Sequence, residues 1–133
     1  MRRVFADSFF FFALFNRNDA AHRKAVELSQ QRGVQLVTTA WVLTELADGL
    51  ACSTARQAVR RFVLNFQLPG QHVVLPATAA LWHEGIDLYD RRKDKQWSLT
   101  DCISMVAMTE QGITDVLTGD HHFVQAGFKA LFI

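Results

Sequence analysis

Cysteine is scarce in this chain, and this excludes the protein classes that depend on it. The 133 residues include two cysteines, Cys52 and Cys102, which lie far apart and form no Cys-x-x-Cys pair. They therefore supply neither a disulfide framework nor a zinc site. This usage predicts a reducing, intracellular compartment.

An excess of charge of one sign is also missing. Fourteen Lys and Arg residues stand against thirteen Asp and Glu residues, which leaves a formal net charge of +1. A strongly basic domain built to bind nucleic acid over its whole surface is therefore excluded. Any basic surface on this protein has to be local.

The chain has no long hydrophobic run. The longest early run, Phe9 to Phe15, is much shorter than the roughly 20 residues that a membrane-spanning helix needs. Asp7 precedes the run, and Asn16-Arg17-Asn18-Asp19 after it offers no small-residue cleavage site, so we do not expect a signal peptide. We expect a soluble cytoplasmic protein without a membrane partner.

Apolar residues, in contrast, are plentiful. Half of the residues are hydrophobic and a fifth are charged, which is enough apolar material for a core. No repeat or low-complexity linker interrupts the chain. Since domains commonly have about 100 to 150 residues, we expect one domain over residues 1–133.

Short apolar runs alternate with longer segments of helical period, which is typical of an α/β fold. The predicted strands are Val4–Ala6, Gln35–Thr38, Val73–Leu75, Val116–Thr118 and Ala130–Phe132. The predicted helices are Asp19–Arg32, Trp41–Leu50, Thr54–Leu68, Ala77–Arg92 and Ser98–Gln111. Because connections of this type place successive strands parallel, we expect a five-stranded, mostly parallel sheet with helices on both faces.

Acidic residues follow two of these strands. Asp7 comes directly after the first predicted strand, and Asp120 follows the fourth with Gly119 between. Ligands of such sheets lie beyond the carboxyl ends of the strands, so both are candidate functional residues. The structural alternative is a turn or a helix N-cap, where Asp is also common.

Two further acids fall on predicted helices. Glu45 shares a helix face with Trp41 and Val42, and burying a charge there requires a partner or a metal. An ion pair with Arg, or a position from which the carboxylate reaches water, would explain Glu45 equally well. Asp101 stands three residues after Ser98, which is the spacing of a capping box. Asp101 either caps its helix or binds a metal.

Together the four acids flank one sheet, and clustered carboxylates raise one another's pKa unless a cation lies between them. Oxygen ligands without clustered Cys or His favour Mg²⁺ or Mn²⁺. Such an ion can activate water for hydrolysis of a phosphodiester. The acids concerned are Asp7, Glu45, Asp101 and Asp120.

At these residues the chain resembles a known family, the PIN-domain endoribonucleases, and especially the VapC-type toxins of toxin–antitoxin pairs. The resemblance covers nearly the whole chain and rests on Val4-Phe5-Ala6-Asp7-Ser8, Trp41-Val42-Leu43-Thr44-Glu45-Leu46, Ser98-Leu99-Thr100-Asp101-Cys102 and Leu117-Thr118-Gly119-Asp120-His121-His122-Phe123. It implies a three-layer α/β/α fold and a metal-dependent endoribonuclease that leaves a 5′-phosphate and a 3′-hydroxyl. It also implies an RNA substrate and a small antitoxin as a partner.

The resemblance assigns the metal to Asp7, Glu45, Asp101 and Asp120. The hydroxyls of Ser8, Ser98 and Thr118 resemble the family's supporting groups, which orient carboxylates or waters, although ordinary caps and turns also use hydroxyls. Phe9 departs from the small polar residue common after Ser8, and His121 adds an imidazole beside the fourth acid. Asp115 would replace Asp120 in a slipped alignment, but it falls within the strand pattern, so we prefer Asp120.

Three other features leave alternatives open. The loop residues Arg91, Arg92, Lys93 and Lys95 either contact an RNA backbone or form a solvated loop. The phenylalanines at positions 9–12 and 15 exceed what one helix face needs, which predicts a homodimer or an antitoxin interface. A phosphatase is disfavoured because Asp7-Ser8-Phe9 lacks a second Asp. A non-catalytic PIN-fold module that binds RNA or protein remains the alternative function.

Overall fold

The structure is a computed structural model that describes all residues 1–133, and its centre is a five-stranded sheet. The strands are β1 (Arg2–Ala6), β2 (Val34–Thr39), β3 (Val73–Leu75), β4 (Asp115–Leu117) and β5 (Lys129–Ala130). Their order across the sheet is β3-β2-β1-β4-β5, and every neighbouring pair is parallel. The predicted α/β class and parallel sheet are confirmed.

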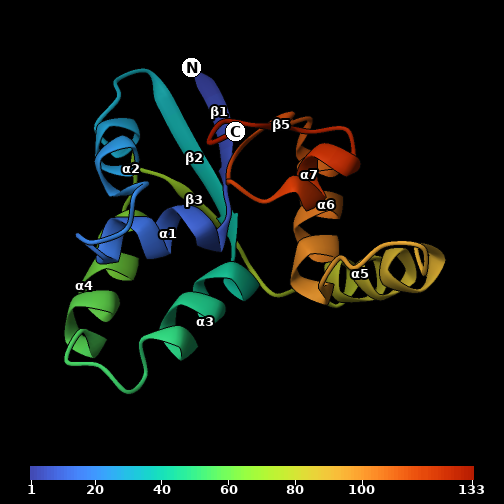
Figure 1. Ribbon diagram of the computed structural model, residues 1–133, viewed down its shortest axis with the longest axis horizontal. Coiled ribbons are helices and arrows are strands. Elements are labelled where there is room, and N and C mark those ends of the chain that lie inside the picture. The colour runs from blue at the N-terminus through green and yellow to red at the C-terminus, as the bar shows by residue number, and fades with distance from the viewer.

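Helices cover the sheet on both sides, which gives the three-layer α/β/α arrangement (Figure 1). They are α1 (Ser8–Phe15), α2 (His22–Ser29), α3 (Ala40–Gly49), α4 (Arg56–Phe66), α5 (Ala79–Arg91), α6 (Leu99–Gln111) and α7 (His121–Gln125). In Figure 1, α1, α2 and α4 lie on one side, α5, α6 and α7 lie on the other, and α3 lies beyond the carboxyl end of β2. None of these helices is both long and apolar enough to cross a membrane.

The strand order determines where a site can form. The chain passes from β1 to β2 on one side, whereas β4 pairs with β1 on the other side. Parallel sheets open a crevice beyond the carboxyl ends of the strands at such a reversal. The residues that follow β1 and β4 therefore lie beside one another, and these include Asp7 and Thr118.

The phenylalanine-rich segment forms α1, a helix that the sequence analysis did not assign. Phe10 and Phe11 are fully buried, and no phenylalanine of the segment is exposed. Phe11 lies edge-on to Phe62 and Phe66 of α4, and Phe15 to Phe62. The number of these rings does not exceed what the monomer can bury, contrary to our expectation, because α4 supplies a second aromatic surface against which α1 packs. The homodimer itself stays a prediction.

Other element boundaries also differ from those predicted. The second helix begins at His22 rather than Asp19, because the Asp19 carboxylate accepts a hydrogen bond from the Ala21 N–H at 2.8 Å and forms a local turn. The last strand is Lys129–Ala130 rather than Ala130–Phe132. A short helix, α7, follows Asp120 and was not predicted.

Helices α5 and α6 pack closely at Gly85, which is buried. A Cβ atom on this residue would overlap the side chain of Ile103 and lie 3.3 Å from its Cα. The absence of a side chain here lets α5 lie directly on α6. This contact fixes the position of the loop that joins the two helices and leads into Ser98.

Candidate active site

Asp7 directly follows β1 at the carboxyl edge of the sheet and is buried, with 5% of its surface exposed. It occupies the N-cap position of α1, but its side chain makes no capping hydrogen bond to that helix. The carboxylate instead accepts a hydrogen bond from the Thr118 hydroxyl at 2.8 Å. The simple explanation of Asp7 as a helix cap therefore does not account for where its side chain points.

Thr118 joins the two strand ends that carry acids. While its hydroxyl donates to Asp7, the same oxygen accepts from the backbone N–H of Asp120 at 3.1 Å. Thr118 is fully buried, so the position of this hydroxyl is fixed by packing. It couples Asp7 after β1 to Asp120 after β4.

Asp101 stands in the first turn of α6 and makes the predicted capping box. The Asp101 backbone N–H donates to Ser98 Oγ at 3.0 Å, and the Ser98 N–H donates to Asp101 Oδ2 at 3.1 Å. The same carboxylate oxygen also lies 3.1 Å from Nδ1 of His122. Asp101 thus caps its helix and faces the other acids at the same time.

Asp120 is the N-cap of α7, where its Oδ1 accepts from the His122 N–H at 2.9 Å. Nδ1 of His122 is 3.3 Å from Asp120 Oδ1, so this ring lies between two carboxylates. One ligand atom from each of Asp101, Asp120 and His122 falls within 4.8 Å of the others. His122 was missed by the sequence analysis, which considered its exposed neighbour His121 instead.

Glu45 reaches the crevice from α3, whose start is capped by Thr39 through a 3.2 Å hydrogen bond to the Val42 N–H. Its carboxylate is half-buried and forms no ion pair with a basic side chain, so the Arg alternative is excluded. Burial first, and then the charge of Asp101, raise the pKa of Glu45, and the nearby Ser8 side chain opposes them.

Asp115, which a slipped alignment would have placed at the site, lies elsewhere. It is the first residue of β4, and Arg2 Nη2 pairs with its Oδ2 at 2.6 Å. It therefore stands at the amino end of the strand, opposite the crevice. Of the two alternatives, Asp120 is the residue that the fold brings to the other acids.

The carboxylates strongly influence one another. Burial first, and then the charges of Asp101 and Glu45, raise the pKa of Asp7 to about 7, against the opposing effect of the Thr118 hydrogen bond. The pKa of Glu45 is raised by burial and by Asp101. A carboxyl group with so high a pKa is only partly ionised near neutral pH unless a positive charge lies beside it.

A divalent cation fits this donor set. Hard carboxylate oxygens, with one imidazole at the edge, match the preferences of Mg²⁺ and Mn²⁺. No lysine or arginine pairs with Asp7 or Glu45 in place of a cation. The set Asp101, Asp120 and His122 is therefore compatible with a bound divalent cation, whereas Asp7 and Glu45 lie outside the group whose ligand atoms fall within 4.8 Å of one another.

The sequence pattern of the PIN domain matches residues 4–129. This chain belongs to the PIN-domain family. The matched residues include all four candidate acids, which are Asp7, Glu45, Asp101 and Asp120.

Relatives of this PIN domain include VapC-type toxins. The 23S rRNA-specific endonuclease VapC20 of Mycobacterium tuberculosis is 28% identical in an alignment 131 residues long that covers 94% of this chain and 95% of that protein. The crystal structure of M. tuberculosis VapC20, described as a sarcin–ricin loop cleaving toxin, superposes with a TM-score of 0.82 at 26% identity over 94% and 95% of the two chains.

More distant structures share the fold alone. VapBC2 from Rickettsia felis, bound to a DNA fragment from its promoter, gives a TM-score of 0.67 at 13% identity over 96% of each chain. FitAcB from Neisseria gonorrhoeae gives 0.62 at 18% identity over 96% of this chain and 95% of its own. Both agree with the three-layer architecture of this PIN domain.

Phe9, which departs from the family pattern, packs over the loop that carries Asp120. Its ring lies edge-on to Phe132 with centroids 5.3 Å apart. A Cβ atom on Gly119 would come within 2.7 Å of Phe9 Cζ and 2.8 Å of Cε2. The large ring and the missing side chain are therefore complementary, and the contact holds the Thr118–Asp120 segment in place.

We expect Gly119→Ala to lower the free energy of unfolding by about 1–3 kcal/mol, the usual range for overpacking a tight contact. Urea denaturation of the purified variant measures this. In a Phe9→Ala background the same substitution should cost much less, because the ring is gone, so the two changes should couple in a double-mutant cycle. Equal costs in both backgrounds would rule out the Phe9 contact as the cause.

Proposed function

We propose that this protein is an endoribonuclease that hydrolyses RNA phosphodiester bonds with Mg²⁺ or Mn²⁺ held by Asp7, Glu45, Asp101 and Asp120. The proposal is supported by Asp101, Asp120 and His122, which place ligand atoms within 4.8 Å of one another. It is also supported by buried Asp7, on which the charges of Asp101 and Glu45 act, and by the lack of a basic partner for Asp7 and Glu45. A cation at this point lowers the pKa of a bound water and stabilises the developing charge of an in-line displacement.

The chain's own residues hold this geometry before a substrate arrives. Thr118 orients Asp7 and Ser98 orients Asp101 by hydrogen bonding. Such supporting contacts fix the direction of each carboxylate and typically change metal affinity or activity by about 10- to 100-fold. The expected products carry a 5′-phosphate and a 3′-hydroxyl.

We also propose that the protein is the toxin of a toxin–antitoxin pair and acts on ribosomal RNA. The support is its similarity to VapC20, a 23S rRNA-specific endonuclease described as a sarcin–ricin loop cleaving toxin, along nearly the whole chain. The first RNA to test is accordingly the sarcin–ricin loop. A small antitoxin is the expected partner, and a homodimer of single-domain subunits is the expected assembly.

The test is cleavage of end-labelled RNA by the purified protein. The panel contains a sarcin–ricin loop hairpin, an unrelated hairpin, a single strand and a perfect duplex, each with Mg²⁺, with Mn²⁺ and with a chelator. We expect cuts at exposed bases when a metal is present and none with the chelator, because bases in loops can be splayed out whereas the A-form major groove is too narrow to read.

Two results would contradict the proposal. Cleavage that survives both the chelator and Asp7→Asn would point to another nuclease or to a metal-free mechanism. Metal binding without cleavage of any RNA in the panel would favour the non-catalytic PIN-fold module. Asp115→Asn is the matched control, because it removes an acid at the opposite end of β4 and should leave cleavage unchanged.

A further inference from the structure

A basic hollow lies between the end of α5 and the start of α6. Its volume is about 660 Å³, and the residues that define it include Tyr89, Arg92, Lys93, Lys95, Trp97 and Ser98. No acidic residue lines it. In a chain whose net charge is +1, three positive side chains around one hollow make a local basic surface, which is what the composition left possible.

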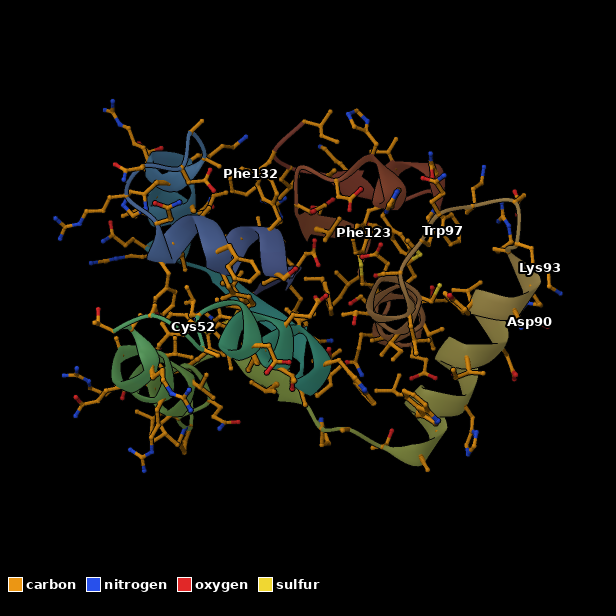
Figure 2. The ribbon with its side chains drawn as sticks, turned by 60° about the horizontal axis from the view of Figure 1, so that its bottom comes forward. Cys52, Asp90, Lys93, Trp97, Phe123 and Phe132 are labelled. Atoms are coloured by element: carbon orange, nitrogen blue, oxygen red, sulfur yellow. The ribbon has the colours of Figure 1, made fainter.

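The hollow adjoins the carboxylate site. Ser98 lines the hollow, and its backbone N–H donates to Asp101 Oδ2 at 3.1 Å. Figure 2 shows Trp97 beside α6, with Lys93 at the outer edge of the loop that precedes it. A chain of phosphates that leaves the carboxylates around the first turn of α6 would thus pass directly into the basic hollow.

One wall of the hollow is fixed. The Arg92 guanidinium lies over the Trp97 ring, 4.9 Å from its centroid, and bonds both oxygens of Asp94 at 3.0 and 3.1 Å. Trp97 is buried, and its Nε1 donates to Gln125 Oε1 of α7 at 2.9 Å. This stack holds the loop in one conformation against α6 and α7.

The remaining groups are available to a ligand. Tyr89 is 52% exposed. Lys93 pairs with Asp90 at 3.2 Å and Lys95 with Asp94 at 3.7 Å, but Lys93 and both acids are more than half exposed. Exposed pairs of this kind contribute little free energy, so the ammonium groups can exchange a carboxylate for a phosphate at small cost.

We propose that this hollow binds the RNA strand next to the cleaved bond, with Lys93 and Lys95 on its phosphates and one unstacked base on the Tyr89 ring. The inference rests on the proposed function, because it takes RNA as the substrate. Positive side chains that follow the backbone, combined with an aromatic ring for a base, are the usual elements of single-strand recognition. The volume falls within the range of roughly 300–1,000 Å³ found for small-ligand pockets, which suits a nucleotide unit.

The test measures binding without cleavage. Fluorescence anisotropy of a labelled single-stranded RNA is recorded with Asp7→Asn protein in chelator over a series of salt concentrations. Adding Lys93→Gln and Lys95→Gln should reduce the steepness of the salt dependence by about 0.7 for each lost phosphate contact. Adding Tyr89→Ala should weaken binding by roughly 5- to 100-fold, the range for loss of one stacked base.

The matched control carries Arg32→Gln and Arg61→Gln, which remove two exposed charges that line no part of the hollow and take part in no ion pair. If the lysine variant binds RNA with the same affinity and salt dependence as this control, the hollow is not an RNA site. Thermal melts of the variants are recorded alongside, because the Lys95 side chain is only 29% exposed and its replacement has to be shown to leave the fold intact.

A cleavage assay in the wild-type background separates this proposal from the proposed function. The Lys93→Gln/Lys95→Gln variant should raise KM with little change in kcat, because it loses binding that is equal in the ground and transition states. Cleavage with an unchanged KM would contradict RNA binding in the basic hollow but would agree with the proposed nuclease function. Absence of cleavage by the wild type would contradict the proposed nuclease function. The anisotropy series would then still show whether the hollow binds RNA.

Discussion

Replacing Asp7 by Asn should reduce metal-dependent RNA cleavage by roughly 100- to 1,000-fold, the range seen when one group that stabilises a transition state electrostatically is removed. The amide keeps the size of the side chain and can still accept the Thr118 hydrogen bond of 2.8 Å. It lacks the negative charge that anchors the cation, so activation of water and stabilisation of the leaving oxygen should fail together.

The measurement is the initial rate on an end-labelled RNA hairpin, compared with wild type and with Asp115→Asn. Glu45→Gln and Asp101→Asn should cause comparable losses. Asp120→Asn should be milder, since its side chain is 38% exposed and water can replace it as a ligand. Retention of more than about a tenth of the rate in Asp7→Asn would remove this residue from the catalytic site.

A weaker variant tests the supporting contacts. Thr118→Val keeps the shape of the residue but removes the hydroxyl that joins Asp7 to the Asp120 backbone. We expect a loss of about 10- to 100-fold, because the carboxylate stays while its orientation is no longer fixed. A loss as large as that of Asp7→Asn would mean that Thr118 acts on the substrate or metal directly.

The sequence could predict candidate residues of this site mainly where an acid follows a predicted strand. Asp7 and Asp120 were found because a short apolar run that ends in an acid has one interpretation once the sheet is parallel, namely a residue at the carboxyl edge. Glu45 was found by helical spacing, and the structure shows that it has no Arg partner. The approach of Asp120 to Asp101 depends on the strand order, which the sequence implies only indirectly.

His122 and α7 could not be found in the same way. Helix α7 has five residues, too few for a periodic pattern, and Asp120 at its N-cap was the available signal. His122 points to the acids because it is the second residue of that helix and its N–H bonds Asp120. Nothing in the sequence separated it from His121, which turns to solvent.

The prediction for the phenylalanine segment failed for a related reason. Residues 9–15 are apolar on every side, so no period distinguishes a helix from a strand. Their number indicated an exposed interface, whereas Phe62 and Phe66 lie some fifty positions later and complete the cluster around Phe11. Burial of a run depends on which distant segments pack against it, and this is a property of the fold.

The second large effect concerns stability and pH. In the absence of divalent metal, the protein should become more stable as the pH falls from 8 to 5. Burial first, and then the charges of Asp101 and Glu45, raise the pKa of Asp7 to about 7 in the folded state, far above its ordinary value of 3.8. The folded protein therefore holds a proton that the unfolded chain has released.

The linkage between protonation and folding gives the direction in which stability changes with pH. A group with a raised folded pKa contributes stability that is complete below about pH 4 and is lost as the pH rises through about 7. A shift of this size corresponds to a few kcal/mol, at about 1.4 kcal/mol for each pH unit. The raised pKa of Glu45 acts in the same direction. His72 acts in the opposite direction, because partial burial lowers the pKa of its ring, whose Nδ1 accepts a hydrogen bond from the Leu36 N–H.

Urea denaturation of wild type and Asp7→Asn at several pH values, in chelator, isolates the Asp7 contribution. The variant should be the more stable protein at pH 8, and the difference should vanish towards pH 4, because the amide resembles the protonated acid. The His72 contribution is common to both proteins and cancels.

Mn²⁺ should reverse this dependence of stability on pH in wild type but not in Asp7→Asn. A cation that binds the ionised cluster of the folded protein stabilises it by mass action, by about 2.7 kcal/mol at a concentration 100 times the Kd. The wild type should therefore gain thermal stability with Mn²⁺ at pH 8 and gain little at pH 5, where protons compete for the carboxylates. Asp7→Asn should lose most of this gain, whereas Asp115→Asn should keep it. An equal gain in Asp7→Asn would place the metal away from the crevice and separate the pH effect from any role in catalysis.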